Sequence, residues 1–209
     1  MYLSDRDIRW AIETGALVLP ADAKVDPSSV DLRLDNVDQA KVWDIESYKE
    51  DLAASGNSEP HLHLGSFRSV DFSEKYLIQP PVAPVDETEK VYRNGNQILV
   101  RPGGFLLWQT KEKVGTPEVN PSLICFVDGK STRARTGFLV HFTAPTIHAG
   151  WSGQVVLEIT NLGPVVFVLK EDDVIAQLTI ARISGVPEKT HRQVGSSTMG
   201  QTTVAGKKI

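Results

Sequence analysis

Residues 97–108 read QILVRPGGFLLW, two short apolar runs on either side of a Pro-Gly-Gly sequence. Glycine supplies the backbone freedom of a tight turn and proline cannot donate to a sheet ladder, so this stretch predicts two strands joined by a turn. Similar apolar runs follow at 123–127, 138–142, 155–159, 165–169 and 174–180. Many short strands separated by turn residues are typical of a β-sandwich or jelly roll.

A short helix is expected ahead of this β-rich part. Ser4 followed by Asp7 resembles a capping box, and Gly15 is suited to end a helix. Between them three apolar residues fall on one helical face: Ile8, Ala11 and Ile12.

The stretch 27–34 that follows alternates apolar and polar residues at Val30, Leu32 and Leu34, which predicts a strand with one buried face. We expect its acidic residues to face solvent or a neighbouring subunit. Residues 44–60 are charged and poor in β-branched side chains, which indicates a short surface helix or an excursion from the core. No chemistry is evident in residues 44–60.

Bulk properties predict one soluble domain over residues 1–209. The chain has 41% hydrophobic and 23% charged residues, and a net charge of −4 with 22 Lys and Arg spread along it. This distribution of charge shows no basic cluster of the kind that binds a nucleic-acid polymer, and no apolar run is long enough to span a bilayer. With no secretory signal at Met1 and one unpaired Cys125, we expect a cytoplasmic protein. Residues 190–209 are small, polar and Gly-punctuated, which predicts a flexible C-terminal arm able to act as a lid.

Two nucleotide-related motifs are excluded by their spacing. Gly129-Lys130-Ser131-Thr132 lacks the earlier Gly of a phosphate-binding P-loop, since Ile124 stands at that position. A zinc deaminase needs His-x-Glu and Cys-x-x-Cys, and no His here has Glu two places later. His61 and His63 lack a third ligand, so we assign them no metal.

A more specific pattern lies at 128–135 (DGKSTRAR), 141–144 (HFTA), 150–153 (GWSG) and 156–161 (VLEITN). This string resembles the signature of the dCTP deaminase family, within the dUTPase-like superfamily. The resemblance extends to 4–8, 27–34, 110–114 and 200–202, and covers most of the chain outside 44–79. It implies a distorted jelly-roll β-barrel or sandwich, and a homotrimer that binds a deoxynucleotide between subunits.

The resemblance also implies roles in the reaction. Glu158 would be the general base that activates water against cytosine C4, Ser131 would position that water, and Arg135 would stabilise charge. A carboxylate suits this role only if an apolar setting raises its pKa. Taken alone, each residue has a simpler interpretation: Glu158 on a solvent-facing strand, Arg135 in an interface ion pair, Ser131 as a turn hydroxyl. The three in register favour the family role.

Nucleotide-binding positions follow from the same resemblance: Lys130, Phe142, Thr143, Ala144, His148 and Gln201. Lys130 and Gln201 would contact phosphate, and backbone groups of Phe142 and Ala144 would read the cytosine edge. Magnesium would accompany the triphosphate, with no zinc and no protein-held metal. Trp151 suits core or trimer packing as well as a ligand platform.

Five residues depart from the family pattern, and one of them is Lys130, which stands where the family usually has Arg. His148 stands where the family has an acidic residue and Thr146 where it has Arg, both at positions that contact sugar and phosphate. Ser197 and Thr198 replace a Lys-Tyr pair ahead of Gln201. These departures indicate a modified nucleotide pocket.

The leading hypothesis is hydrolytic deamination of dCTP to dUTP and ammonia. A dUTP diphosphatase, or a bifunctional dCTP deaminase and dUTP diphosphatase, is a second interpretation because the scaffold is shared. A nucleotide-binding or sensing homologue without catalysis is a third, motivated by the residues at 148, 197 and 198.

Overall fold

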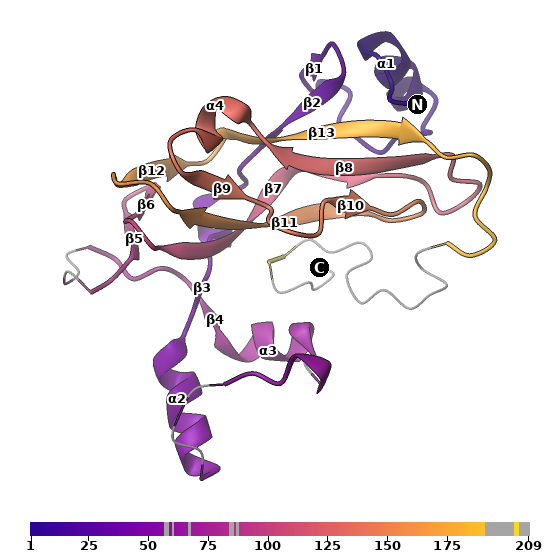
Figure 1. Ribbon diagram of the computed structural model, residues 1–209. Coiled ribbons are helices and arrows are strands. Elements are labelled where there is room, and N and C mark those ends of the chain that lie inside the picture. Colours follow the sequence, from indigo (N-terminus) through magenta and orange to yellow (C-terminus); the bar gives the residue numbers. More distant parts are fainter. Residues whose placement is uncertain are drawn as a thin grey trace.

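Figure 1 shows the computed structural model of the chain, in which stacked β-sheets carry a helix near the N-terminus and a pair of helices projects from one edge. The structure describes residues 1–190 except 57, 58, 60, 67, 84, 85 and 87, together with 203 and 204. The helices are α1 (Asp5–Glu13), α2 (Ile45–Ala54), α3 (Ser69–Tyr76) and α4 (Ser131–Ala134), with 3₁₀ turns at Val37–Gln39 and Leu64–Ser66. The strands are β1 (Val25–Asp26), β2 (Ser29–Arg33), β3 (Val42–Trp43), β4 (Leu77–Ile78), β5 (Val91–Asn94), β6 (Gln97–Val100), β7 (Phe105–Gly115), β8 (Leu123–Gly129), β9 (Phe138–Val140), β10 (Thr146–Ile147), β11 (Ser152–Asn161), β12 (Phe167–Lys170) and β13 (Val174–Arg182).

In the described part of the chain the strands pair with one another in antiparallel orientation. Their sheets have the orders β1-β2-β13-β8-β10, β7-β11-β9, β12-β6-β5 and β3-β4. The expected mainly β fold with a short N-terminal helix is confirmed. The described strands form four separate sheets, not one closed barrel.

The core lies between the five-stranded sheet and the β7-β11-β9 sheet, which are stacked in Figure 1. Along β11 alternate residues are buried, so Leu157 and Ile159 are fully buried while Glu158 between them points to the other face. Burying one such aliphatic side chain contributes about 1.5–3 kcal/mol, so the apolar alternation holds the strand in this register.

The apolar runs correspond to strands closely. The opening stretch forms β6 and β7 around its turn, and the five later runs form β8, β9, β11, β12 and β13. α1 is also confirmed, with Ile8 and Ala11 buried and Gly15 at a φ of 72° just beyond its end. The capping box is wrong, because the Ser4 side chain makes no cap hydrogen bond.

β2 is buried on both faces, contrary to the expectation of one buried face. It lies between β1 and β13, and Asp31 is only 4% exposed alongside the fully buried Val30 and Leu32. The expectation that its acidic residues face solvent is therefore wrong for Asp31. A buried carboxylate needs cationic partners, and its partners belong to the candidate site described below.

The surface helix expected within 44–60 is confirmed as α2, whose N-terminus is capped by the Asp44 carboxylate. α2 and α3 pack through an aromatic cluster of Trp43, Tyr48, Phe72 and Tyr76, with neighbouring ring centroids 4.8–5.2 Å apart. A pocket beside α3 is lined by Gln39, Lys41, Ser73, Glu74, Leu77, Thr203 and Val204. Val204 is 5% exposed there, so this part of the predicted arm is packed on the fold.

None of the described helices is long and apolar enough to cross a bilayer.

Gly115 is a point where the fold requires glycine. Its φ is 136°, and a Cβ there would lie 2.1 Å from the Trp151 carbonyl oxygen. We expect Gly115→Ala to lower the free energy of unfolding by at least about 2 kcal/mol, because both backbone strain and a backbone clash are introduced. Urea unfolding would measure the loss, with Gly185→Ala as control, since nothing lies within 4 Å of a Cβ there. Equal stability of the two variants would contradict this account of the β7–β11 contact.

Candidate active site

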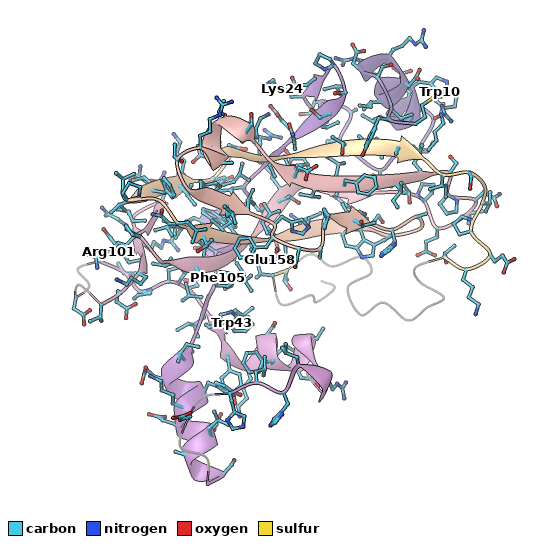
Figure 2. The ribbon with its side chains drawn as sticks, viewed as in Figure 1. Trp10, Lys24, Trp43, Arg101, Phe105 and Glu158 are labelled. Carbon is cyan, nitrogen blue, oxygen red and sulfur yellow. The ribbon has the colours of Figure 1, made fainter. Side chains whose placement is uncertain are left out.

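Glu158 is placed by the register of three strands. On one side it is paired with Leu107 of β7, and on the other the His141 backbone N–H donates to the Glu158 carbonyl at 2.8 Å. Its side chain is 36% exposed. Figure 2 shows Glu158 near Phe105, on the outward face of the β7-β11-β9 sheet. The carboxylate thus lies on a rigid strand with access to solvent.

The surroundings of the carboxylate keep it ionised. Partial burial opposes the charged form, but His141 Nδ1 lies 3.1 Å from Glu158 Oε2, and the backbone N–H groups of Glu158 and Phe142 also stabilise the charge. Together these lower the pKa of Glu158 below its ordinary value. The expectation of a raised pKa is therefore wrong for this protomer, because the neighbouring imidazole outweighs desolvation.

The chain turns helically after Gly129 and forms α4, which begins at Ser131 directly after Lys130. The Arg135 N–H approaches the Ser131 carbonyl at 3.4 Å, so the two residues lie one turn apart. Both side chains are exposed, and in the described part of the chain neither makes a hydrogen bond or an ion pair. α4 packs on β9, the strand between it and β11. Ser131 and Arg135 are therefore available to a ligand or to another chain.

Lys130 lies just before α4 in a cluster of charges with Asp31, Lys24 and Asp26. Its ammonium pairs with the buried Asp31 and lies 3.9 Å from Asp26, while Lys24 approaches Asp31 at 2.8 Å. Figure 2 shows Lys24 on the β1–β2 side of the molecule. Lys130 therefore supports a buried carboxylate, a role that the sequence did not suggest.

The loop after β9 carries three of the residues expected to bind the nucleotide. Phe142, Thr143 and Ala144 are all exposed, and the Phe142 ring lies 6.1 Å from the Phe105 ring. The Ala144 carbonyl accepts a hydrogen bond from His141 Nε2 at 2.9 Å. The structure thus brings this loop next to Glu158.

His148 lies elsewhere. It lines a groove of about 440 Å³ with Ile124, Ala149, Ile183, Pro187, Lys189 and Thr190. Ile124 is near the start of β8, whereas Lys130 follows its end, so about 20 Å of strand separates the two places. One protomer does not bring Lys130 and His148 together. Thr146 is half-buried on β10 beside this groove, and Gln201, Ser197 and Thr198 lie outside the described residues.

Three residues of the site were not predicted: His141, Asp31 and Lys24. His141 belongs to the quoted signature, but only the β9–β11 register shows that it faces Glu158.

Burial raises the pKa of Cys125 to about 12, which leaves that thiol neutral. Within the described residues, no group of three or more His, Cys, Asp or Glu side chains could hold a metal ion.

Comparisons with known proteins identify a family. The family model described as dCTP deaminase-like matches residues 2–183. A protein of Natronomonas pharaonis named dCTP deaminase is 34% identical over 207 residues, covering 97% of this chain and 91% of its own. A Streptomyces coelicolor protein named dCTP deaminase, dUMP-forming, is 32% identical over 206 residues, covering 96% and 91%.

A solved structure shares the fold. The 2'-deoxycytidine 5'-triphosphate deaminase from Agrobacterium tumefaciens matches with a TM-score of 0.57 at 18% identity, covering 88% of this chain. The present chain spans 48% of that longer chain.

The Asp31 cluster gives a pH-dependent prediction. Burial opposes ionisation of Asp31, but hydrogen bonds from Lys130 and Lys24 lower its pKa below the ordinary value. Its stabilising effect is therefore complete above the unfolded-state pKa of about 4 and is lost as pH falls through the lower folded-state pKa. We expect Asp31→Asn to cost about 1–3 kcal/mol at pH 7 and distinctly less in acid.

Urea unfolding at neutral and acid pH would test this, with the more exposed Asp26→Asn as the matched control, for which we expect a loss below about 0.5 kcal/mol. An Asp31→Asn loss that is the same at both pH values would show that the ion pairs do not stabilise the fold.

Proposed function

Because the chain belongs to the dCTP deaminase-like family, we propose that it hydrolyses dCTP to dUTP and ammonia, with Glu158 as the general base and without zinc. The observation that supports this most is the Glu158 carboxylate, which is ionised, oriented on a strand and open to solvent beside an exposed loop. An oriented carboxylate of this kind can accept a proton from water.

The proton balance follows from the reaction. Water attacks cytosine C4 while Glu158 accepts one of its protons and passes it to ring N3. The second water proton moves to the amino group, the C4–N bond breaks, and ammonia leaves. Glu158 is then a carboxylate again, so each turnover consumes one water and leaves the protein unchanged.

Ser131 and Arg135 complete the proposed site. The Ser131 hydroxyl would orient the attacking water, and the Arg135 guanidinium would stabilise negative charge that develops as C4 becomes tetrahedral. Their side chains are exposed and make no hydrogen bond or ion pair in the described part of the chain, which supports a role toward a ligand.

We propose a homotrimer with each site between two subunits. The expected phosphate residue Lys130 and sugar residue His148 lie at opposite ends of β8, so one nucleotide meets both only if they come from different chains. The exposed Leu139 and Phe142 beside the site supply apolar surface for such an interface.

Light scattering on the purified chain tests the assembly. We expect a mass about three times the chain mass of 22.9 kDa. A monomer that releases ammonia from dCTP at full rate would contradict a site shared between subunits.

Phosphate recognition would rest on Lys130 and Gln201, with His148 near the sugar. Lys130 already pairs with Asp31, so a phosphate would share its ammonium with that carboxylate. Magnesium fits the phosphate oxygens of the nucleotide better than any described set of protein side chains, and when bound it would neutralise part of their charge.

A bifunctional dCTP deaminase and dUTP diphosphatase is the second candidate. The observation that favours it is similarity to relatives named dUMP-forming, such as those of Streptomyces coelicolor and Dictyoglomus thermophilum, at 32% and 31% identity. The two candidates share the deamination step and differ in whether the phosphate chain is also cleaved.

Replacing the proposed base gives the direct mutational test. We expect Glu158→Gln to lower the rate of ammonia release from dCTP and magnesium at least about 10²-fold, because the amide cannot accept the proton. Ammonia assay and chromatography of products would be run on the wild type, on Glu158→Gln and on the control Glu50→Gln, an exposed carboxylate on α2.

The products distinguish the candidates. dUTP indicates a deaminase alone, dUMP a bifunctional enzyme, and dCMP a diphosphatase. Nucleotide binding without any turnover, unchanged by Glu158→Gln, would replace the proposal by a sensing role.

A further inference from the structure

His141 occupies an unusual place at the end of β9. Its φ is 58°, in the left-handed region that non-glycine residues rarely adopt, and its side chain is only 7% exposed. Such a conformation costs about 1–3 kcal/mol, so the surrounding contacts must fix it. The ring contacts two groups, the Ala144 carbonyl and the Glu158 carboxylate.

The contact with Ala144 fixes one ring proton. His141 Nε2 lies 2.9 Å from the Ala144 oxygen, and a carbonyl oxygen only accepts hydrogen bonds. Nε2 must therefore carry a proton. In a neutral imidazole with Nε2 protonated, Nδ1 has a lone pair and no proton.

Nδ1 faces the carboxylate. It lies 3.1 Å from Glu158 Oε2, within ion-pair distance, although the two are not aligned for a good hydrogen bond and Nδ1 has no other partner. A small rotation of either side chain would align the two groups without changing which atoms face each other. Two lone pairs at 3.1 Å would repel, so a proton between them is required.

We propose that the His141–Glu158 pair holds one proton more than a neutral imidazole and an ionised carboxylate hold together. His141 thereby acts as a positioning residue for the base. The imidazole carries both ring protons and the carboxylate is ionised. This is the arrangement in which Oε2 accepts from Nδ1 and the backbone N–H groups of Glu158 and Phe142 also face a negative charge.

The alternative arrangement places the proton on Glu158 and leaves the imidazole neutral. It fits less well, because the backbone N–H groups of Glu158 and Phe142 that face this carboxyl can only donate hydrogen bonds and therefore favour its ionised form. Within the described residues, His141 is the one ionisable side chain that acts on this carboxyl. The extra proton therefore resides on the ring.

The consequence for catalysis rests on the proposed function. A fixed imidazolium holds one carboxylate oxygen, so the other oxygen is oriented toward water. It also keeps Glu158 ionised before each turnover, which a general base needs. Removing the ring should therefore slow the chemical step more than it weakens nucleotide binding.

Nitrogen NMR of the intact protein, with ¹⁵N-labelled histidine, tests the proton directly. We expect both ring nitrogens of His141 to be protonated at neutral pH in the wild type, and Nδ1 to lose its proton in Glu158→Gln. An unprotonated Nδ1 in the wild type overturns the proposal. This readout needs no substrate, so it stays decisive if the protein proves not to release ammonia.

Activity tests the positioning role with His141→Asn. Asparagine tolerates the left-handed conformation, so this variant keeps the backbone while it loses the ring. We expect kcat for ammonia release to fall about 10²-fold with KM changed less than about threefold. The matched control is His61→Gln. His61 is exposed in the segment between α2 and α3, and we expect wild-type values for this variant.

His141→Gly adds a second test, since glycine also suits the backbone and leaves space for a small molecule. We expect added imidazole to restore part of its activity. A folded His141→Asn with wild-type kcat, or a fall in activity that appears only as a rise in KM, contradicts the positioning role.

Discussion

The antiparallel register between β9 and β11 is the constraint on which the candidate site depends. It pairs Ile159 with Val140, and this alone sets His141 opposite Glu158. Side chains alternate along a strand, so a slip of one residue would turn Glu158 into the core and expose Leu157. The apolar residues of β11 thus do more than stabilise the sheet, because their burial fixes the direction in which the carboxylate points.

Asp31 is a buried carboxylate and Glu158 a half-buried one, and different partners stabilise their charges. Asp31 is held between Lys24 and Lys130, whereas Glu158 has one imidazole and backbone N–H groups and remains 36% exposed. A carboxylate held by two ammonium groups is suited to stabilise a fold. One with a single partner and an open side is suited to exchange a proton. The partners of Asp31 on β2 therefore suit a structural role, and those of Glu158 on β11 suit the proton transfer proposed for it.

Much of this arrangement was predictable from local patterns. The apolar runs located the strands from β6 onward except β10, and the signature pointed to Glu158, Ser131 and Arg135. Local patterns failed where distant segments meet: Asp31 is buried because β2 lies between β1 and β13, and Glu158 has a lowered pKa because β9 brings His141 against it. Neither contact leaves a periodic trace in sequence. The placement of His148 away from Lys130 likewise depends on how β8 runs across the sheet.

The central claim is that this chain adds water to cytosine C4, and isotope transfer tests it most directly. Wild-type protein would be incubated with dCTP and magnesium in heavy-oxygen water, and the products analysed by mass spectrometry with fragmentation of base and phosphate. The account predicts one heavy oxygen in the uracil ring of the product and an equal amount of ammonia. Heavy oxygen found only in phosphate, with the cytosine intact, would contradict it.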